Sequence, residues 1–422
     1  MIQSFEDAEA LLRTYIPPRG HFRDNYTLDT MQAIMRALGN PQNTYEVVHV
    51  AGTSGKTSTS YYIASMLKAA GKKVGLTVSP HIDQINERIQ INLKPLDEQA
   101  YCAALTTFIQ KINKLSVKPT YFELLVAFAF WEFARQKVDY AVIEVGLGGL
   151  LDATNVISNP RKVCVITDIG FDHMHILGHT YEAIATQKVG IIQHSNEVFC
   201  LPQNDEVAGV LQKRTDEKSA RLHVAKSLDS RAAGLPAFQQ RNWSLAASVY
   251  DYLAERDLLP RLTAEQLIQT MQTYIPGRIE TIKLVGKTIV MDGAHNSQKM
   301  EALVKSLQLL FPGKKFAVIL GLGKTDDDKT AEILNRLLPL VQTICVVEFY
   351  GEQDYKKRSI KQESIMKIAQ DMGYKIIEGK SNLNDAFRWL LTQPGDYCLI
   401  SGSFYLLNKI RPLVFGYNRD ND

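Results

Sequence analysis

Residues 46–60 constrain the fold of this chain more than any other segment. A β-branched run ends in a glycine-bounded loop there, and a helical pattern follows at once. In that arrangement, loop backbone N–H groups and the positive end of the helix face a bound anion, while a lysine adds a mobile charge. Val50 stands where the consensus G-x-x-x-x-G-K-[ST] has its first glycine. The segment still predicts a phosphate-binding loop, and its candidate residues are consecutive: Gly52, Thr53, Ser54, Gly55, Lys56, Thr57 and Ser58.

Short β-branched runs alternate with longer helical segments along the whole chain, which predicts α/β layers with largely parallel sheets. A chain of 422 residues is too long for one ordinary core, so we expect two domains. The strongest break is Tyr274-Ile275-Pro276-Gly277-Arg278, which places the expected domains at 1–280 and 281–422. Strands are expected at 73–78, 138–145, 163–167 and 197–201, and near 288–292, 315–320, 343–348, 374–377 and 397–401. Helices are expected at 57–70, 122–135 and 181–192.

Composition limits the possible partners and the compartment. The chain is 45% hydrophobic and 22% charged, as in globular proteins, and its net charge of +3 is too small to predict nucleic acid or an anionic membrane as a partner. Its five cysteines contain no C-x-x-C pair, which favours reduced, buried thiols. The acidic N-terminus does not read as a signal peptide, and the apolar runs are too short to cross a bilayer. We expect a cytoplasmic protein.

Polar residues at strand ends are the candidates for chemistry, because ligands bind beyond the carboxyl ends of strands in open α/β sheets. Ser79 could lend a hydroxyl to a metal, and Arg88 could bind a carboxylate, although an ordinary turn with a surface arginine is the alternative. Glu144 lies inside an apolar strand, where a carboxylate is costly unless it meets a cation, so it is a candidate Mg²⁺ ligand. The glycines that follow do not complete a dinucleotide fingerprint, because Leu151 replaces the third glycine.

Three histidines follow another strand, at positions 173, 175 and 179. A zinc site is one interpretation of this spacing, but no cysteine or glutamate zinc motif accompanies them, so we favour His173 alone as a ligand of the nucleotide's metal. Lys188 closes the next helix, where a lysine on its own is usually a solvated complement to the helix dipole. In the second domain, Asp292 and His295 follow a strand, and their turn suits contacts with a nucleotide or a transferring phosphoryl group.

Taken together, these motifs resemble the folylpolyglutamate synthase and dihydrofolate synthase family of the Mur ligase superfamily. The resemblance runs through nearly the whole chain and rests on the order and spacing of its pieces. They are Gly52 to Lys56, Ser79-Pro80-His81 with Asn86 to Ile89, Phe122-Glu123, Glu144 to Gly149 with Leu151 to Asn155, Asp172-His173, Leu177 to Thr180, Lys188, Gln239 with Asn242, Pro276-Gly277-Arg278, Asp292 to Asn296, and Gly402-Ser403.

The resemblance implies a Mur-ligase-like fold, with an N-terminal P-loop-type ATPase domain and a smaller, Rossmann-like C-terminal domain that binds glutamate. It implies an ATP-dependent carboxylate–amine ligase that joins L-glutamate to a folate or dihydropteroate through an acyl phosphate. Metal, Lys56 and the loop would neutralise charge on the transferring phosphoryl group. The implied partners are these small molecules, with no nucleic acid and no membrane, and we expect a monomer.

The same resemblance assigns roles to single residues. The implied catalytic residues are Lys56, Glu144, His173 and Lys188, the lysine at 188 as a carbamate that bridges metals. Mg²⁺ would be held by Ser58 or Thr57 with Glu144 and His173, and at a second site by Ser79. Outside the loop, the implied ATP-binding residues are Gln239, Asn242, Arg278, Asp292 and His295. The implied substrate residues are Arg88, Phe122, Asp152, Asn155 and Ser403.

Three positions depart from the family pattern. Thr57 replaces the usual glycine, as in the cell-wall Mur ligases, Leu150 replaces an arginine, and Gln187 replaces an acidic residue. These departures leave the acceptor open, so a Mur-type ligase with a non-folate acceptor is the nearest alternative. A nucleotide-dependent switch or ATPase without ligase activity is an alternative from another class. The second α/β domain with Asp292 and His295 argues against a switch, because a switch needs no amino-acid site.

Overall fold

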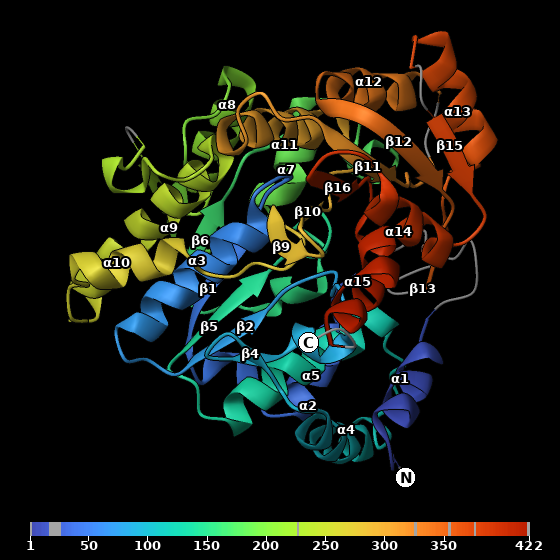
Figure 1. The fold of residues 1–422 in the computed structure, drawn as a ribbon. Helices are drawn as coiled ribbons and strands as arrows, with labels where there is room; N and C mark the ends of the chain where they lie inside the picture. The colour runs from blue at the N-terminus through green and yellow to red at the C-terminus, as the bar shows by residue number, and fades with distance from the viewer. Residues whose placement is uncertain are drawn as a thin grey trace. The chain divides into compact units, whose positions relative to one another are not determined.

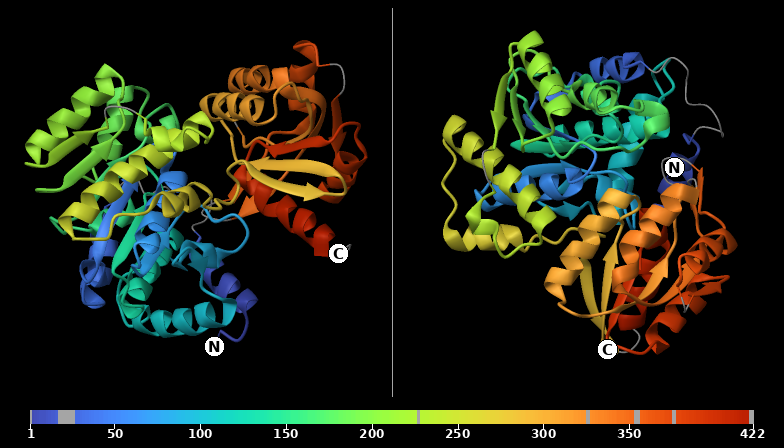
Figure 2. Two further views of the ribbon diagram at one scale, coloured as in Figure 1. Left: turned by 60° about the vertical axis from the view of Figure 1, so that its left-hand side comes forward. Right: turned by 90° about the horizontal axis from the view of Figure 1, so that it is seen from above.

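The computed structural model describes residues 2–16, 27–225, 228–324, 327–352, 356–374 and 377–419. Its contacts divide the chain into two compact units, Met1–Thr273 and Tyr274–Asp422. Both are α/β units built on a mostly parallel sheet, as the alternation of strand and helix patterns predicts. Figures 1 and 2 show the helices layered on the sheet of each unit.

The N-terminal unit contains a sheet in the order β4-β3-β2-β5-β1-β6-β7-β8. The run from β2 to β8 is parallel, and only the two short strands β3 and β4 pair antiparallel. The phosphate-loop strand β1 lies between β5 and β6, so residues after these three strands share one edge of the sheet. The strand bounds are β1 Glu46–Ala51, β2 Val74–Thr77, β3 Gln90–Ile91, β4 Lys94–Pro95, β5 Tyr140–Glu144, β6 Val163–Ile166, β7 Glu197–Cys200 and β8 Arg221–Val224.

Helices cover this sheet because their apolar sides need a partner. A large core joins α1, α2, α4 and α5 to β1 and β5, and a second core joins α7 and α8 to β6 and β7. Helix α3 packs along α9. The helix bounds are α1 Phe5–Arg13, α2 Asp29–Ala37, α3 Lys56–Ala69, α4 Glu98–Ile112, α5 Tyr121–Arg135, α6 Met174–Leu177, α7 Tyr181–Val189, α8 Asp205–Glu217, α9 Ala237–Arg256 and α10 Ala264–Met271. Short 3-10 helices are η1 Pro41–Asn43, η2 Ile85–Arg88, η3 Ala153–Val156 and η4 Ser230–Ala232.

The C-terminal unit contains a sheet in the order β15-β12-β11-β16-β10-β9, parallel except for β9. Helices α11, α12 and α13 share one core with this sheet, and α14 and α15 also contact its strands. The strand bounds are β9 Glu280–Leu284, β10 Lys287–Asp292, β11 Phe316–Leu320, β12 Val341–Val347, β13 Tyr350–Glu352, β14 Lys356–Arg358, β15 Ile377–Lys380 and β16 Tyr397–Ser401. The helix bounds are α11 Ser297–Leu310, α12 Asp327–Leu337, η5 Leu338–Leu340, α13 Gln362–Asp371, α14 Leu383–Thr392 and α15 Phe404–Arg419.

Most expected elements are present within one or two residues, and one strand ends later than expected. The strand expected near 374–377 is described from Ile377 to Lys380, so it extends beyond the expected end; residues 375 and 376 lie outside the described residues. Cys164, Cys200, Cys345 and Cys398 are buried in strands, and burial raises the pKa of each thiol. Among the helices that the structure describes, none combines the length and hydropathy needed to span a bilayer.

Candidate functional site

The phosphate loop joins β1 to α3 through two glycines that no other residue could replace easily. Gly52 has φ +151°, and a Cβ there would lie 1.8 Å from Thr167 Oγ1. Gly55 caps α3 with φ +89°, and a Cβ there would lie 2.3 Å from Asn242 Oδ1. Positive φ disfavours L side chains, and both approaches leave no room for one. Asn242 of α9 therefore lies directly against the start of the helix.

Two backbone N–H groups of the loop do not face an open anion site. Thr53 N and Ser54 N both donate to the Asp168 carbonyl, at 2.9 and 3.2 Å. The Thr53 hydroxyl is also bonded to Gly170, as donor to its carbonyl and as acceptor from its N–H. Arg241 of α9 then binds the Asp168 carboxylate. The loop after β6 thus engages two of the loop N–H groups that were expected to face an anion, and the ATP-binding role of these residues stays a prediction.

Two lysines converge on one carbonyl of the loop. Lys188 Nζ donates to Gly52 O at 2.9 Å, and Lys56 Nζ donates to the same oxygen at 3.1 Å. Lys188 is buried, so the interpretation of this lysine as a solvated dipole complement at a helix end is wrong. Two ammonium groups on one acceptor concentrate positive charge where phosphate is expected, and an anion there would relieve their repulsion.

Glu144 lies at the end of β5 next to the loop helix. Its carboxylate accepts from the Thr57 hydroxyl at 2.9 Å and from Ser79 N at 3.4 Å. The side chain is 3% exposed, as the apolar strand around it indicates. Of the two hydroxyls predicted for the metal, the one that meets Glu144 is that of Thr57; Ser58 is buried in α3. A carboxylate with hydroxyl oxygens beside it is the donor set that Mg²⁺ prefers.

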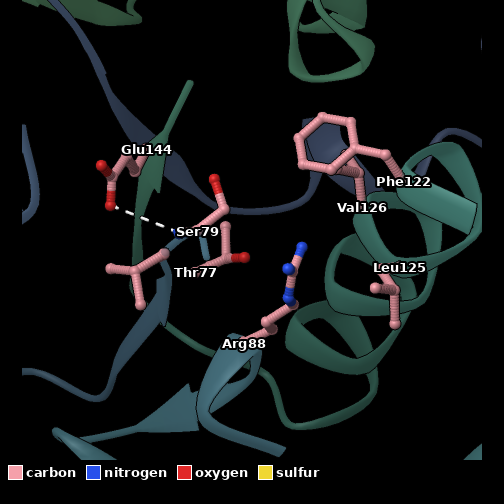
Figure 3. A pocket seen from close by; sticks show the side chains of 8 residues that line it. Thr77, Ser79, Arg88, Phe122, Leu125, Val126 and Glu144 are labelled. Atoms are coloured by element: carbon pink, nitrogen blue, oxygen red, sulfur yellow. Dashed lines mark hydrogen bonds between the residues drawn. The ribbon is translucent and has the colours of Figure 1, made fainter. Parts of the chain in front are cut away.

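A narrow cavity of about 10 Å³, partly open to solvent, lies beside Glu144. Figure 3 shows the Arg88 guanidinium pointing into it, with Ser79 on one side and Phe122 of α5 on the other. Arg88 is only 2% exposed, so the interpretation as a surface arginine is wrong. Phe122 packs so closely on Gly146 that a Cβ there would lie 2.3 Å from the ring. Cation, carboxylate and aromatic side chains thus line one space.

His81 positions Arg88 in this cavity. Arg88 Nε donates to His81 Nδ1 at 3.0 Å. Burial, helped by the positive charges of Arg88 and Arg13, holds the pKa of His81 well below its ordinary value. The ring is therefore neutral and can accept this hydrogen bond.

Asp152 and Asn155 hold the glycine-rich loop that follows β5. The Asp152 carboxylate accepts from Leu147 N at 2.9 Å and from Thr154 N at 3.0 Å. Burial raises the pKa of this carboxyl, and these hydrogen bonds oppose the rise. Asn155 Nδ2 donates to the carbonyls of Leu150 and Gly190. These contacts position backbone, and the predicted substrate role of both residues stays a prediction.

The surroundings of Gln239 and His173 do not test the roles predicted for them. Gln239 lies one turn before Asn242 on α9, is buried, and accepts from the Tyr62 hydroxyl of α3 at 3.2 Å. His173 begins α6 with φ +50°, and its side chain is 39% exposed beside Asp172. Within the described residues, no group of three His, Cys, Asp or Glu side chains could hold a metal ion. The role of His173 as a metal ligand therefore stays a prediction.

The C-terminal unit brings its predicted residues together after β10. The Asp292 carboxylate is buried and accepts from Ile279 N and Ala294 N, both at 2.9 Å. Burial raises the pKa of this carboxyl, and the positive charge of Arg278 opposes the rise. Arg278 lies 4.4 Å from the centre of the Phe404 ring. His295 Nδ1 donates to the Gly293 carbonyl at 2.8 Å, and its Nε2 accepts from Lys299 Nζ at 3.1 Å.

Ser403 caps the beginning of α15, where its hydroxyl accepts from Tyr405 N at 3.1 Å. Asn296 caps α11 in the same way. Ser403 is buried and directly precedes Phe404, whose ring lies against Arg278. The end of β16 and Arg278 therefore lie at one edge of this sheet.

Sequence reasoning missed several residues that hold these groups. Lys299, Phe404 and the pair Asp168–Arg241 were given no role, although Lys299 lies one helical turn after His295 and that spacing could have indicated it. The contact between Asp168 and Arg241 spans 73 residues and has no local signal.

Comparison with known proteins places this geometry in a family. Residues 50–278 match the Mur ligase middle domain, and residues 277–404 match the Mur ligase, glutamate ligase domain. The chain is 30% identical to the dihydrofolate synthase/folylpolyglutamate synthase of Bacillus subtilis (strain 168), over 97% of this chain and 99% of that one. The chain belongs to the folylpolyglutamate synthase and dihydrofolate synthase family of Mur ligases.

Solved structures of this family agree with the assignment. The Mycobacterium tuberculosis folylpolyglutamate synthase complexed with ADP is 28% identical, with a TM-score of 0.83 and 98% of each chain covered. A folylpolyglutamate synthase complex with AMPPCP and folate is also 28% identical, with a TM-score of 0.80, and covers 98% of this chain and 100% of that chain. The predicted resemblance, the two-domain α/β fold and the class of ATP-dependent ligase are thereby confirmed. Neither alternative is favoured, because the similarity extends over both units.

Proposed function

We propose that this protein uses ATP to join L-glutamate to a carboxyl group of a folate, as a folylpolyglutamate synthase, with dihydropteroate as the second acceptor to test. The observation that carries the proposal is the full-length match to this family, together with a carbonyl of the phosphate loop, Gly52 O, to which both Lys56 and Lys188 donate. The reaction forms an acyl phosphate from ATP and the acceptor carboxylate. The glutamate amine then attacks that carbonyl carbon, and phosphate leaves as the amide forms.

The N-terminal unit holds the residues proposed for phosphoryl transfer. Lys56 provides positive charge against the transferring phosphoryl group, where preorganised charge is worth most. For Lys188 we propose the carbamate that the family resemblance implies, which would replace its positive charge with a carboxylate that can hold metal. Asn242 lies next to Gly55, and Gln239 accepts from Tyr62 of α3; both are proposed to bind ATP. Arg88, with Phe122 beside it, is proposed to bind the acceptor in the cavity at Glu144.

Mg²⁺ fits the residues at the end of β5. The Thr57 hydroxyl and the buried Glu144 carboxylate are hard oxygen donors 2.9 Å apart, and Ser79 follows β2 next to them. We propose that Thr57 and Glu144 hold one ion with His173, and that Ser79 belongs to a second site. Bound Mg²⁺ would neutralise charge on the phosphates and orient them.

The C-terminal unit is proposed to hold ATP through Arg278, Asp292 and His295 and to place glutamate near Ser403. The buried Asp292 beside the half-buried Arg278 offers both an acceptor and a cation for such ligands. We expect the protein to act as a monomer in the cytoplasm. Light scattering of the purified chain would test the monomeric state.

The experiment is a phosphate-release assay that varies the acceptor. Release should require ATP, L-glutamate and either a reduced folate or dihydropteroate together, with one amide formed per phosphate. Phosphate release that is unchanged without any acceptor would instead indicate an ATPase, and turnover only with a non-folate acid would indicate another Mur-type ligase.

Lys188 variants test the proposed carbamate. Lys188→Ala should abolish amide formation, whereas Lys213→Ala, which removes an exposed lysine of α8, should not. If a carbamate is the active form, Lys188→Glu should retain more activity than Lys188→Arg, because only the former supplies a carboxylate. More activity in Lys188→Arg than in Lys188→Glu would instead argue for an ammonium at this position.

A further inference from the structure

A second, larger cavity lies in the N-terminal unit away from the strand ends that carry the proposed chemistry. Its volume is about 670 Å³, within the range of sites for small molecules. It is lined by residues of α2, by the segment before β1, by η3 and its continuation, and by the end of α8. The segment before β1 and the continuation of η3 toward β6 approach the amino ends of these strands. The phosphate loop, by contrast, follows the carboxyl end of β1.

The charge of this cavity has one sign. Arg36, Arg214 and Lys218 line it, and no aspartate or glutamate does so among the described residues. Arg36 and Lys218 make no ion pair with another described residue, and Arg214 lies 3.9 Å from an exposed Glu217 carboxylate. Three cations from two helices around one cavity attract an anion and repel a cation.

Buried polar atoms in the wall also lack partners. Gln42 is 3% exposed, lines the cavity, and its Oε1 has no hydrogen-bond partner in the described part of the chain. Arg214 Nε is likewise buried and without a partner there, although the same guanidinium donates to Ile192 O at 3.0 Å. An unmet buried acceptor and an unmet buried donor each cost stability unless something binds them.

The interior behind the cavity adds further positive charge. Lys162 is fully buried, and its ammonium donates to the carbonyls of Ile157, which lines the cavity, and Ile191. Neither partner is a carboxylate. Burial lowers the pKa of this lysine, and the positive charge of Arg214 lowers it further. An anion in the cavity would stabilise both cations.

We infer that this cavity is a binding site for a small organic anion that carries a phosphate or a carboxylate group, separate from the phosphate loop. Arg36, Arg214 and Lys218 bind the acidic group, the Gln42 amide oxygen accepts from a donor on the ligand, and apolar side chains such as Met35 and Val156 contact its body. Asn155 lines the cavity and also holds the glycine-rich loop, so the ligand contacts a residue that positions the proposed site.

The test is calorimetric titration of the full chain with glycerol 3-phosphate and, separately, with succinate. Both titrations are made with saturating AMPPCP, so that the phosphate loop is already occupied. At least one acid should bind with a stoichiometry of one, and the comparison shows whether phosphate or carboxylate is preferred. Arg36→Gln and Lys218→Gln should each weaken binding about tenfold, the effect of losing a hydrogen bond to a charged group.

The matched control is Arg221→Gln, which removes an exposed arginine of β8 outside the cavity and should leave the affinity unchanged. Hydrogen exchange should show protection in α2 and at the end of α8 when the acid is bound. The proposal is overturned if neither acid binds at millimolar concentration, if AMPPCP displaces the acid, or if the cavity variants bind as well as the control. Circular dichroism of each variant establishes that it is folded.

Discussion

The neutral, buried His81 makes acid sensitivity a quantitative prediction. Its pKa, like that of the buried His49, lies well below the ordinary value of 6.5 because burial disfavours the charged ring. Below pH 6.5 the unfolded chain gains a proton at each position and the folded chain does not. Stability is therefore full above the unfolded-state pKa and is lost as the pH falls below it.

The size of the loss follows from proton linkage. At one pH unit below the unfolded-state pKa, the unfolded chain gains about 1.4 kcal/mol per histidine that stays neutral when folded. The two histidines together should remove about 2.8 kcal/mol between about pH 7.5 and about pH 5.5. His81→Asn should halve this histidine contribution, because asparagine does not titrate and its oxygen can still accept from Arg88 Nε.

Urea unfolding of the wild type and of His81→Asn at both pH values measures the effect, with exposed His194→Asn as the control. The difference in acid loss between wild type and His81→Asn should be about 1.4 kcal/mol, and that between wild type and His194→Asn should be smaller. Because other groups also titrate, only these differences are compared. An acid loss that is the same in wild type and His81→Asn would refute the neutral, buried state of His81.

Three further substitutions test the site. Gly55→Ala should weaken AMPPCP binding at least about tenfold, because its Cβ would meet Asn242. The control Gly71→Ala also has positive φ, +81°, but has open space around it and should bind AMPPCP normally. Equal affinity of both variants in a fluorescence titration would contradict this. Asp152→Ala should destabilise the protein by about 3 kcal/mol in urea, because it leaves one buried and one partly buried N–H group without an acceptor. A loss under about 1 kcal/mol would show that the loop re-forms its hydrogen bonds. Phe404→Leu removes the ring that contacts Arg278 and should weaken ATP binding about fivefold, the effect of losing a cation–π contact of about 1 kcal/mol. Unchanged ATP affinity in calorimetry would show that this ring does not contribute to the ATP site.

Sequence patterns predicted the parts of the fold that local chemistry specifies. The glycine loop and Lys56, the buried strand around Glu144 and the turn at Asp292 each carry their signal within a few residues. The antiparallel strands β3, β4, β13 and β14 were not predicted, because two or three residues are too few to show an alternation. The end of β15 was placed too early for a related reason, since its short run has no clear boundary.

Long-range partnerships account for what was missed in the site. Nothing near Lys188 in the sequence shows that its amine reaches Gly52, 136 residues away. The burial of Arg88 likewise depends on how η2 folds against α5, and a local reading could not choose between a surface and a buried arginine. The resemblance to a known family supplied those assignments, and the packing supplied their physical reason.

The Asp168 carbonyl has a consequence for how quickly and tightly nucleotide can be held. Thr53 and Ser54 already donate their N–H groups to it, so a triphosphate that claims those donors must first displace a neighbouring loop. Measured affinity would then be the intrinsic affinity reduced by the fraction of molecules whose loop is released. Removing the ion pair between Arg241 and Asp168 would raise that fraction, so the loss of this contact would tighten nucleotide binding.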